Sequence, residues 1–543
     1  MGKLRIMNLS NFRLRLALIL SFIIVNSCHK TSKKRNLNEF IYLETTVERL
    51  IYGYKKGDFK VVDVIKEYID RIKKIDMAGP RLRSIIQINP DAVKIASELD
   101  NLLSKGKLKG PLHGIPVILK DNIDSGDKMN TTAGSRALIN SKANEDAFIV
   151  KKLRESGAVI LGKANLSEWA NFRGQNSTSG WSGINGQTKN PYVLSRNPCG
   201  SSSGSGVAVS ANLTVLAIGT ETNGSIMCPS NANGIVGIKP TVGLISRTGI
   251  IPISFTQDTS GPMARTLSDA VIALNVMKGQ DSLDSKTLSI PNKTLDYTKF
   301  LIQGGIKNKR IGVYSLPLGN KSRRKGYNAD VDSLFKKSIK LIRSLGAEII
   351  EIDTINHRDN GIHSYNVMLH EYKDGLNKYF KSLKSNSQIK NLDDLIKFNE
   401  KDSIELKYFN QAYLKLANET GGMKSDEYKN SLLLLNKYSK EDGIDRVMNK
   451  HNLDAIISPT GSPAWSSDLL NGDNYHIGSS SPAARAGYPN ITIPMGNVHG
   501  LPVGISFFGR AWSESVLIEI AFDFEQISKA RIIPNFKLND EYL

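Results

Sequence analysis

The chain has 543 residues, of which 40% are hydrophobic and 23% charged, the proportions of a globular protein and not of a largely disordered one. Its formal net charge of +20 would suit a surface that binds nucleic acid. The dense basic runs, however, are confined to residues 33–35 and 323–325, and neither alternates with aromatic residues. We therefore expect a lysine-rich, solvated surface and no nucleic-acid partner.

The first 28 residues resemble an export signal. Basic residues precede an apolar run at residues 16–25, which is shorter than the ~20 apolar residues of a membrane-spanning helix. The segment Val25-Asn-Ser-Cys28 resembles the lipobox of bacterial lipoproteins, with asparagine in place of the usual small residue. We expect a lipoprotein-type signal at residues 1–28, a polar tether at 29–40, and a lipid on Cys28 that anchors the exported chain at the cell envelope. An ordinary secretory signal and an uncleaved anchor stay open as alternatives.

Residues 41–543 carry the patterns of one large domain. Helices are expected at Glu44–Tyr54, Val61–Ile75 and from Asn89-Pro90 to about Leu103, where proline would take the first helical position. Short apolar runs typical of strands buried on both faces then alternate with helical segments: strands at Val117–Leu119, Ala158–Leu161, Thr214–Ile218 and Ile235–Ile238, and helices at Phe148–Ser156, Val207–Asn212 and Leu267–Met277. This alternation predicts an α/β fold in which helices cover both faces of a mixed β-sheet.

The second half of the chain differs in composition. Residues 285–450 are lysine-rich and mostly helical, with strand patterns at Arg310–Tyr314 and Glu348–Ile352. We expect them to form a variable helical region that walls the substrate pocket. Apolar strand patterns return near the C-terminus, at Asp454–Ser458, Asn490–Ile493 and Val503–Phe508, before a helix at Ser513–Ser528. These strands are predicted to complete the sheet begun by the first half.

Three segments in fixed order carry the chemistry. They are Gly114-Ile-Pro-Val-Ile-Leu-Lys120-Asp, Pro198-Cys-Gly-Ser201-Ser-Ser-Gly-Ser-Gly206 and Thr220-Glu-Thr-Asn-Gly-Ser225. A serine hydroxyl becomes a nucleophile when a base removes its proton, and a lysine can be that base if burial lowers its pKa towards neutrality. The segments therefore predict a serine nucleophile that is served by a lysine, without a histidine.

Part of the second segment allows another interpretation. Residues 200–204 match the Gly-x-Ser-x-Gly elbow of α/β-hydrolases, in which Ser202 would be the nucleophile of an esterase. That interpretation leaves Lys120 and Ser225 without a role. The three cysteines are too few for a disulfide framework, so Cys199 and Cys228 are expected to be small buried residues. The eight histidines show no ligand spacing, and we expect neither a metal nor another cofactor.

The three segments resemble those of the amidase signature family, and their variants are closest to its peptide-amidase-like branch. The resemblance runs from about Leu50 to Pro534. It implies a Ser–cis-Ser–Lys triad of Ser225 as nucleophile, Ser201 as the bridging serine and Lys120 as base, with Ser202 orienting the pair. The implied oxyanion hole consists of backbone N–H groups of Thr222, Asn223, Gly224 and Ser225.

The family's activity gives the expected function. It is hydrolysis of a linear carboxylic acid amide, either a small molecule or a peptide with a C-terminal amide, to an acid plus ammonia or an amine through an acyl-enzyme. The family also contains the glutaminase-like subunit of a tRNA-dependent amidotransferase, which acts with partner proteins. The predicted export signal argues against that alternative, because an exported chain would be separated from tRNA.

Overall fold

The computed structural model describes residues 40–292, 294–318, 328–352, 354–355, 359–384 and 387–542. The predicted signal at residues 1–28, with Cys28, and all of the predicted tether except residue 40 lie outside the described residues. The chain divides into residues 1–43 and residues 44–543, and the second unit contains the named strands and helices. In the described residues, no helix has both the length and the apolar character required to span a bilayer.

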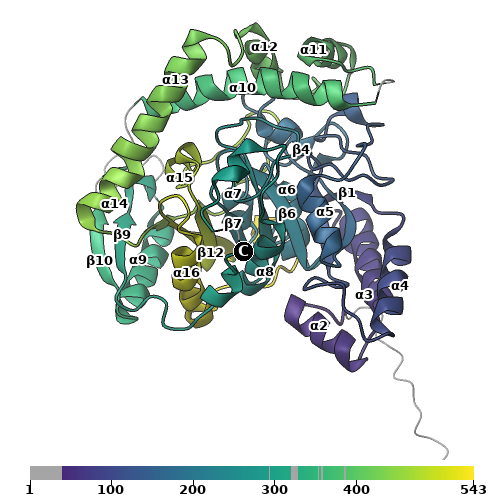
Figure 1. Cartoon of the computed structure of the whole chain (residues 1–543), viewed down its shortest axis with the longest axis horizontal. Coiled ribbons are helices and arrows are strands. Elements are labelled where there is room, and N and C mark those ends of the chain that lie inside the picture. The colour runs from purple at the N-terminus through teal and green to yellow at the C-terminus, as the bar shows by residue number, and fades with distance from the viewer. Residues whose placement is uncertain are drawn as a thin grey trace, which may run out of the picture. The chain divides into compact units, whose positions relative to one another are not determined.

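A mixed sheet of 11 strands runs through the second unit (Figure 1). Its strands, in spatial order, are β1 (Ile85–Ile88), β3 (Val159–Ala164), β2 (Pro116–Lys120), β6 (Leu216–Glu221), β8 (Thr259–Ala264), β7 (Val236–Lys239), β12 (Asn490–Val498), β13 (Leu501–Phe508), β11 (Ala455–Pro459), β9 (Arg310–Tyr314) and β10 (Glu348–Ile352). The neighbours of β2 and of β9 run parallel to them, and the other pairs are antiparallel. Because β12 pairs with β7, the C-terminal strands complete the sheet as predicted.

Helices surround this sheet (Figure 1), which confirms the predicted α/β class. They are α2 (Val47–Lys56), α3 (Val61–Arg71), α4 (Ala92–Leu103), α5 (Phe148–Glu155), α6 (Ser203–Ser210), α7 (Met227–Ala232), α8 (Leu267–Met277), α9 (Ala329–Ser344), α10 (Asn360–Ser382), α11 (Leu392–Lys401), α12 (Ala412–Glu419), α13 (Asp426–Asn436), α14 (Asp445–His451), α15 (Ser481–Ala486) and α16 (Glu514–Ser528). A short hairpin joins β4 (Trp181–Ser182) to β5 (Gly186–Gln187).

The central strands are buried on both faces, as their apolar runs predicted. Every residue of β2, β3, β6 and β7 is buried. Strand β8 was not predicted, because Gly261 and Pro262 interrupt its pattern. A Cβ on Gly261 would lie 1.9 Å from the carbonyl oxygen of Ile238, so the close approach of β7 and β8 requires glycine there.

Three predicted helix starts are corrected, and the first is that of α2, which begins at Val47 and not at Glu44. The helix expected at Val207–Asn212 is α6, which spans Ser203–Ser210 and therefore includes part of the serine–glycine cluster. A Cβ on Gly204 would lie 2.3 Å from the carbonyl oxygen of Ser84. The close packing of this helix against the backbone of Ser84 thus outweighs the low helix propensity of glycine. The helix expected at Pro90 begins at Ala92, and Pro90 lies in the preceding turn.

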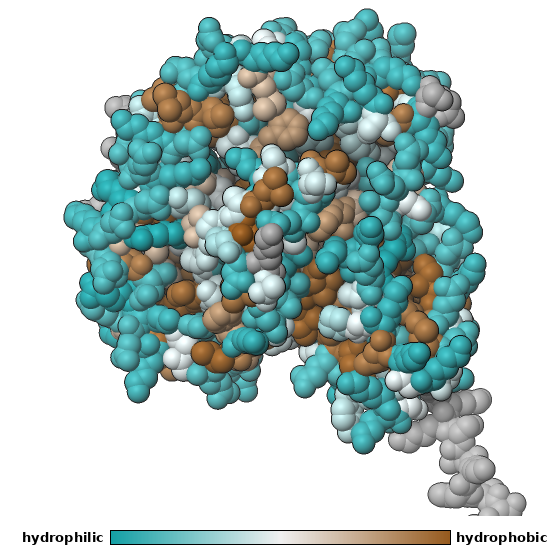
Figure 2. Space-filling model, viewed as in Figure 1, coloured by the Kyte–Doolittle hydropathy of each residue, from teal (hydrophilic) through white to brown (hydrophobic). Residues whose placement is uncertain are grey.

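Residues 285–450 divide into two parts. Strands β9 and β10 belong to the main sheet, whereas α10, α11, α12 and α13 form a separate group of helices (Figure 1). An apolar cluster joins α10, α11 and α12 to the segment that contains Ile251 and Ile253. On the face shown in Figure 2, hydrophilic residues predominate.

Candidate active site

Lys120 is the last residue of β2, between parallel strands β3 and β6, and its side chain is fully buried. Its Nζ lies 2.7 Å from Ser201 Oγ. It also donates to Thr220, 2.8 Å to Oγ1 and 3.2 Å to the carbonyl oxygen. The structure therefore joins the lysine of the first segment to the second and third segments.

Burial is the main influence on this lysine. It lowers the pKa of Lys120 to about 7, against the opposing effects of the negative charges of Asp258 and Glu221. An ammonium group removed from water loses its hydration, and this favours the uncharged amine. Near neutral pH, Lys120 can therefore accept a proton.

Two further lysines are as deeply buried but have other partners. Lys163 donates to the carbonyl oxygen of Ile123, at 2.5 Å, and lies 3.9 Å from Asp121. Lys239 donates to the carbonyl oxygen of Tyr488 at 2.7 Å. Burial lowers the pKa of both, that of Lys239 to about 8. A depressed lysine pKa is thus not sufficient to mark the site, and the contact with a serine hydroxyl distinguishes Lys120 from the other two.

The second segment places two serines with different surroundings. The peptide bond between Gly200 and Ser201 is cis. Ser202 donates its backbone N–H to the carbonyl oxygen of Ser225 over 3.1 Å. Its hydroxyl is bonded to the backbone of Thr220, 3.1 Å to the carbonyl oxygen and 3.2 Å from the N–H. Because the Ser202 hydroxyl is buried and already paired, the geometry disfavours the elbow interpretation.

The third segment turns sharply after β6. Glu221 Oε2 accepts the backbone N–H groups of Ile226, at 2.8 Å, and Met227, at 3.0 Å. In the described part of the chain, the backbone N–H groups of residues 223–225 donate no hydrogen bond, and the Ser225 hydroxyl makes none. Among the described residues, Ser225 Oγ therefore makes no hydrogen bond with Ser201. The loop therefore places the half-buried Ser225 among backbone N–H groups that donate no hydrogen bond.

Side chains on both sides hold this loop in place. Thr222 Oγ1 donates to Asp258 Oδ1 over 2.6 Å, and burial raises the pKa of Asp258 to about 6. On the other side, Asn223 Oδ1 accepts the hydroxyl of Ser480 at 2.8 Å, and its Nδ2 donates to Ser481 at 3.2 Å. Sequence reasoning did not assign these supports, because Asp258, Ser480 and Ser481 are distant in the chain and lie in no motif that specifies the contact.

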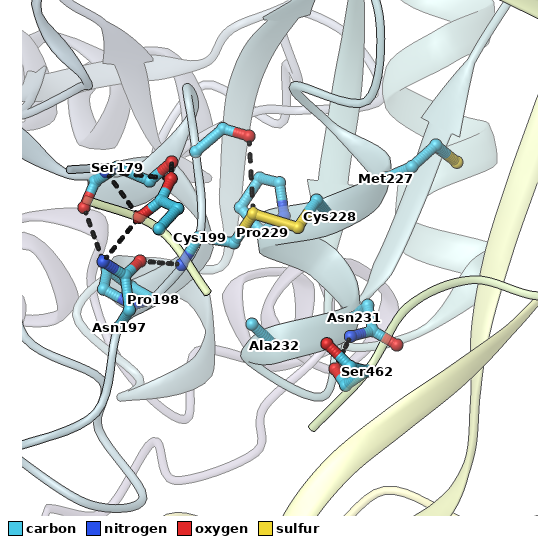
Figure 3. Close-up of a disulfide and its surroundings, with 12 residues drawn as sticks. Ser179, Asn197, Pro198, Cys199, Met227, Cys228, Pro229, Asn231, Ala232 and Ser462 are labelled. Carbon is cyan, nitrogen blue, oxygen red and sulfur yellow. Dashed lines mark hydrogen bonds between the residues drawn. A yellow bond between two sulfur atoms is a disulfide. The ribbon is translucent and has the colours of Figure 1, made fainter. Parts of the chain in front are cut away.

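The two cysteines of the serine segments are not separate buried residues, as was expected, but form a disulfide (Figure 3). Cys199 precedes the Gly200–Ser201 peptide, and Cys228 lies at the start of α7. The backbone N–H of Cys199 also donates to Asn197 Oδ1 over 2.7 Å. The expectation was wrong because it rested on the small number of cysteines in the chain. A disulfide depends on which cysteines the fold places side by side. The disulfide links the segments that carry Ser201 and Ser225.

Comparison with known proteins shows the family of this chain. The sequence profile of the Amidase family matches residues 63–518. A probable amidase of Arabidopsis thaliana is 40% identical over 534 residues, which cover 96% of this chain and 97% of that protein. One component of the glutamyl-tRNA(Gln) amidotransferase of Staphylococcus haemolyticus is 30% identical over 515 residues, which cover 92% of this chain and 98% of that protein.

Solved structures of amidases also match this chain. The native peptide amidase from Stenotrophomonas maltophilia matches with a TM-score of 0.87 and 44% sequence identity, over 92% of this chain and 100% of that one. A structure of the peptide amidase PAM in complex with the competitive inhibitor chymostatin matches equally well, over 91% of this chain and 99% of that one. The fold and these matches define an enzyme that hydrolyses amides. The chain belongs to the amidase signature family, in its peptide-amidase-like branch.

Proposed function

We propose that the chain hydrolyses linear carboxylic acid amides, including peptide C-terminal amides, with Lys120 as base, Ser201 as relay and Ser225 as nucleophile. The observation that carries the proposal is the 2.7 Å contact between Lys120 Nζ and Ser201 Oγ in a fully buried setting. An uncharged amine has two N–H donors and one lone pair. Both donors can bond to Thr220, through its Oγ1 and carbonyl oxygen, which leaves the lone pair for the proton of Ser201.

The proposed reaction begins as Ser225 Oγ attacks the amide carbonyl. Ser225 passes its proton to Ser201, which passes its own to Lys120. The unused N–H groups of residues 223–225 would hold the oxyanion, and each such donor typically contributes ~3 kcal/mol. The N–H of Thr222 completes the proposed set. Proton return through Ser201 releases ammonia or an amine, and water then hydrolyses the acyl-enzyme.

The resemblance to peptide amidases supports the substrate class. The matched structures include a peptide amidase with a bound competitive inhibitor. The test is to incubate the chain that begins after Cys28 with peptide C-terminal amides, fatty amides, anilides and glutamine, and to measure the ammonia or amine released. We expect turnover of peptide amides by the wild type and none by a folded Ser225→Ala variant. Turnover that survives in Ser225→Ala would refute the nucleophile assignment.

We further propose that the chain is exported and lipid-anchored through Cys28. The sequence pattern of residues 1–28 supports this, and so does the disulfide between Cys199 and Cys228, because disulfides persist mainly in oxidising compartments. Cell fractionation and labelling with a radioactive fatty acid test the proposal. We expect the label in the envelope fraction of cells that make the wild type and no label there in cells that make Cys28→Ala. An unlabelled cytosolic product would contradict it and would favour the amidotransferase alternative.

A further inference from the structure

A buried carboxylate outside the proposed triad, that of Glu371, accepts four hydrogen bonds. Glu371 lies in the middle of α10 and has no exposed surface. Its Oε2 accepts Ser254 Oγ at 2.5 Å and the N–H of Thr256 at 3.1 Å. Its Oε1 accepts Thr256 Oγ1 at 2.5 Å and the Tyr428 hydroxyl of α13 at 2.7 Å. Burying a carboxylate is costly unless donors surround it, so these contacts fix residues 254–256 against α10.

The same loop is bound on its other side to the third segment. Asp258 Oδ2 accepts the N–H groups of Ile253 and Ser254, each at 2.8 Å. Its Oδ1 accepts Thr222 Oγ1 at 2.6 Å. One continuous path of hydrogen bonds therefore runs from Glu371 through residues 253–258 to Thr222.

A second path through Gln257, a residue of the same loop, joins the same two places. Ser364, one of the buried residues of α10, donates its hydroxyl to Gln257 Oε1 over 2.7 Å. Gln257 Nε2 in turn donates to the carbonyl oxygen of Thr222 over 3.4 Å. Both paths start on α10 and end on the residue that begins the loop of N–H donors.

We propose that Glu371 is a positioning residue for catalysis, which holds residues 253–258 so that Thr222 keeps the N–H groups of residues 223–225 aimed at the developing oxyanion. This inference rests on the proposed function of those N–H groups. Oxyanion donors act only within a narrow distance range, about 2.7–3.1 Å. Removing one donor typically costs ~10²–10³-fold in kcat, so misplacing the loop is expected to cost about tenfold to a hundredfold.

The test variant is Glu371→Gln, which keeps the size of the side chain but replaces the charged acceptor with a neutral amide whose nitrogen can only donate. We expect kcat to fall about tenfold to a hundredfold while KM changes less than about threefold, because the oxyanion exists in the transition state and not in the bound substrate. A peptide aldehyde forms an oxyanion with the nucleophile, so its affinity should fall in parallel with kcat/KM. The matched control is Glu419→Gln, at the exposed end of α12, which should behave as the wild type.

A second variant keeps the test valid if Glu371→Gln does not fold. Thr256→Val leaves the carboxylate in place and removes one of its hydroxyl donors, so a smaller fall in kcat with unchanged KM is expected. The inference would be overturned if a folded Glu371→Gln had the kcat and the aldehyde affinity of the wild type. If Glu371→Gln does not fold, the same result in Thr256→Val would overturn it. Ser225→Ala separates the two proposals. If it is inactive while Glu371→Gln matches the wild type, this inference alone fails, whereas an active Ser225→Ala refutes the proposed function itself.

Discussion

Removing the disulfide between Cys199 and Cys228 should destabilise the enzyme and lower its activity, because the bond links the segments that carry Ser201 and Ser225. The bond closes a loop with a sequence separation of 29 residues. In the chain-entropy description, a loop of that length stabilises the folded state by about 3.5 kcal/mol, because it restricts the unfolded chain. The perturbation is Cys199→Ala/Cys228→Ala in the chain that begins after Cys28. The sequence holds three cysteines, so this variant has none.

The assay is urea unfolding, followed by intrinsic fluorescence, together with kcat for a peptide amide. The variant should unfold at lower urea than the oxidised wild type and should lose activity, because the segments of Ser201 and Ser225 are no longer linked. Reductant should bring the wild type to the level of the variant and leave the variant itself unchanged. Equal urea midpoints and equal kcat for the variant and the oxidised wild type would refute the reasoning.

The remaining predictions concern the proposed triad. kcat/KM should rise with pH around an apparent pKa near 7, because Lys120 acts as a base only when uncharged; a flat profile from pH 6 to 8 would argue against it. Between about pH 7 and 10.5 the unfolded chain binds a proton at Lys120 that the folded chain does not, so the contribution of this group to stability rises with pH across that window. The urea midpoint of the wild type should therefore increase relative to that of Lys120→Met as the pH rises. A difference between the two midpoints that does not change with pH would contradict this. Ser201→Ala should lower kcat by about a thousandfold or more, whereas Ser202→Ala should cost less; the reverse order would restore Ser202 as the nucleophile.

Much of the fold was predictable because buried strands appear in the sequence as continuous apolar runs and helices as apolar residues at helical spacing. The apolar runs that gave β2, β3, β6 and β7 are strands whose every residue is buried. Helix α8 was predicted with its observed bounds, Leu267–Met277. Two of the failures, the start of α6 and the missed β8, lie where backbone packs on backbone. At Gly204 and Gly261 a side chain would collide with neighbouring carbonyl groups, and propensity alone cannot anticipate such contacts.

The candidate site was predictable only in its residue types. Motif order indicated that Lys120, Ser201 and Ser225 belong together, but motifs do not specify which hydrogen bonds support them. The contact of Thr222 with Asp258 and the role of Glu371 depend on loops and helices that meet only in the folded chain. The disulfide was missed for the same reason, since two cysteines in separate loops have no local pattern that pairs them.

Covalent trapping tests the central claim most directly. A fluorophosphonate that reacts with activated serine hydroxyls should modify the enzyme once, and mass spectrometry of the digested protein should place the label on Ser225. Labelling should slow as pH falls through about 7, as Lys120 becomes protonated, and should be absent in Ser225→Ala. A label on Ser201 or Ser202, or undiminished labelling of Ser225→Ala, would contradict the account.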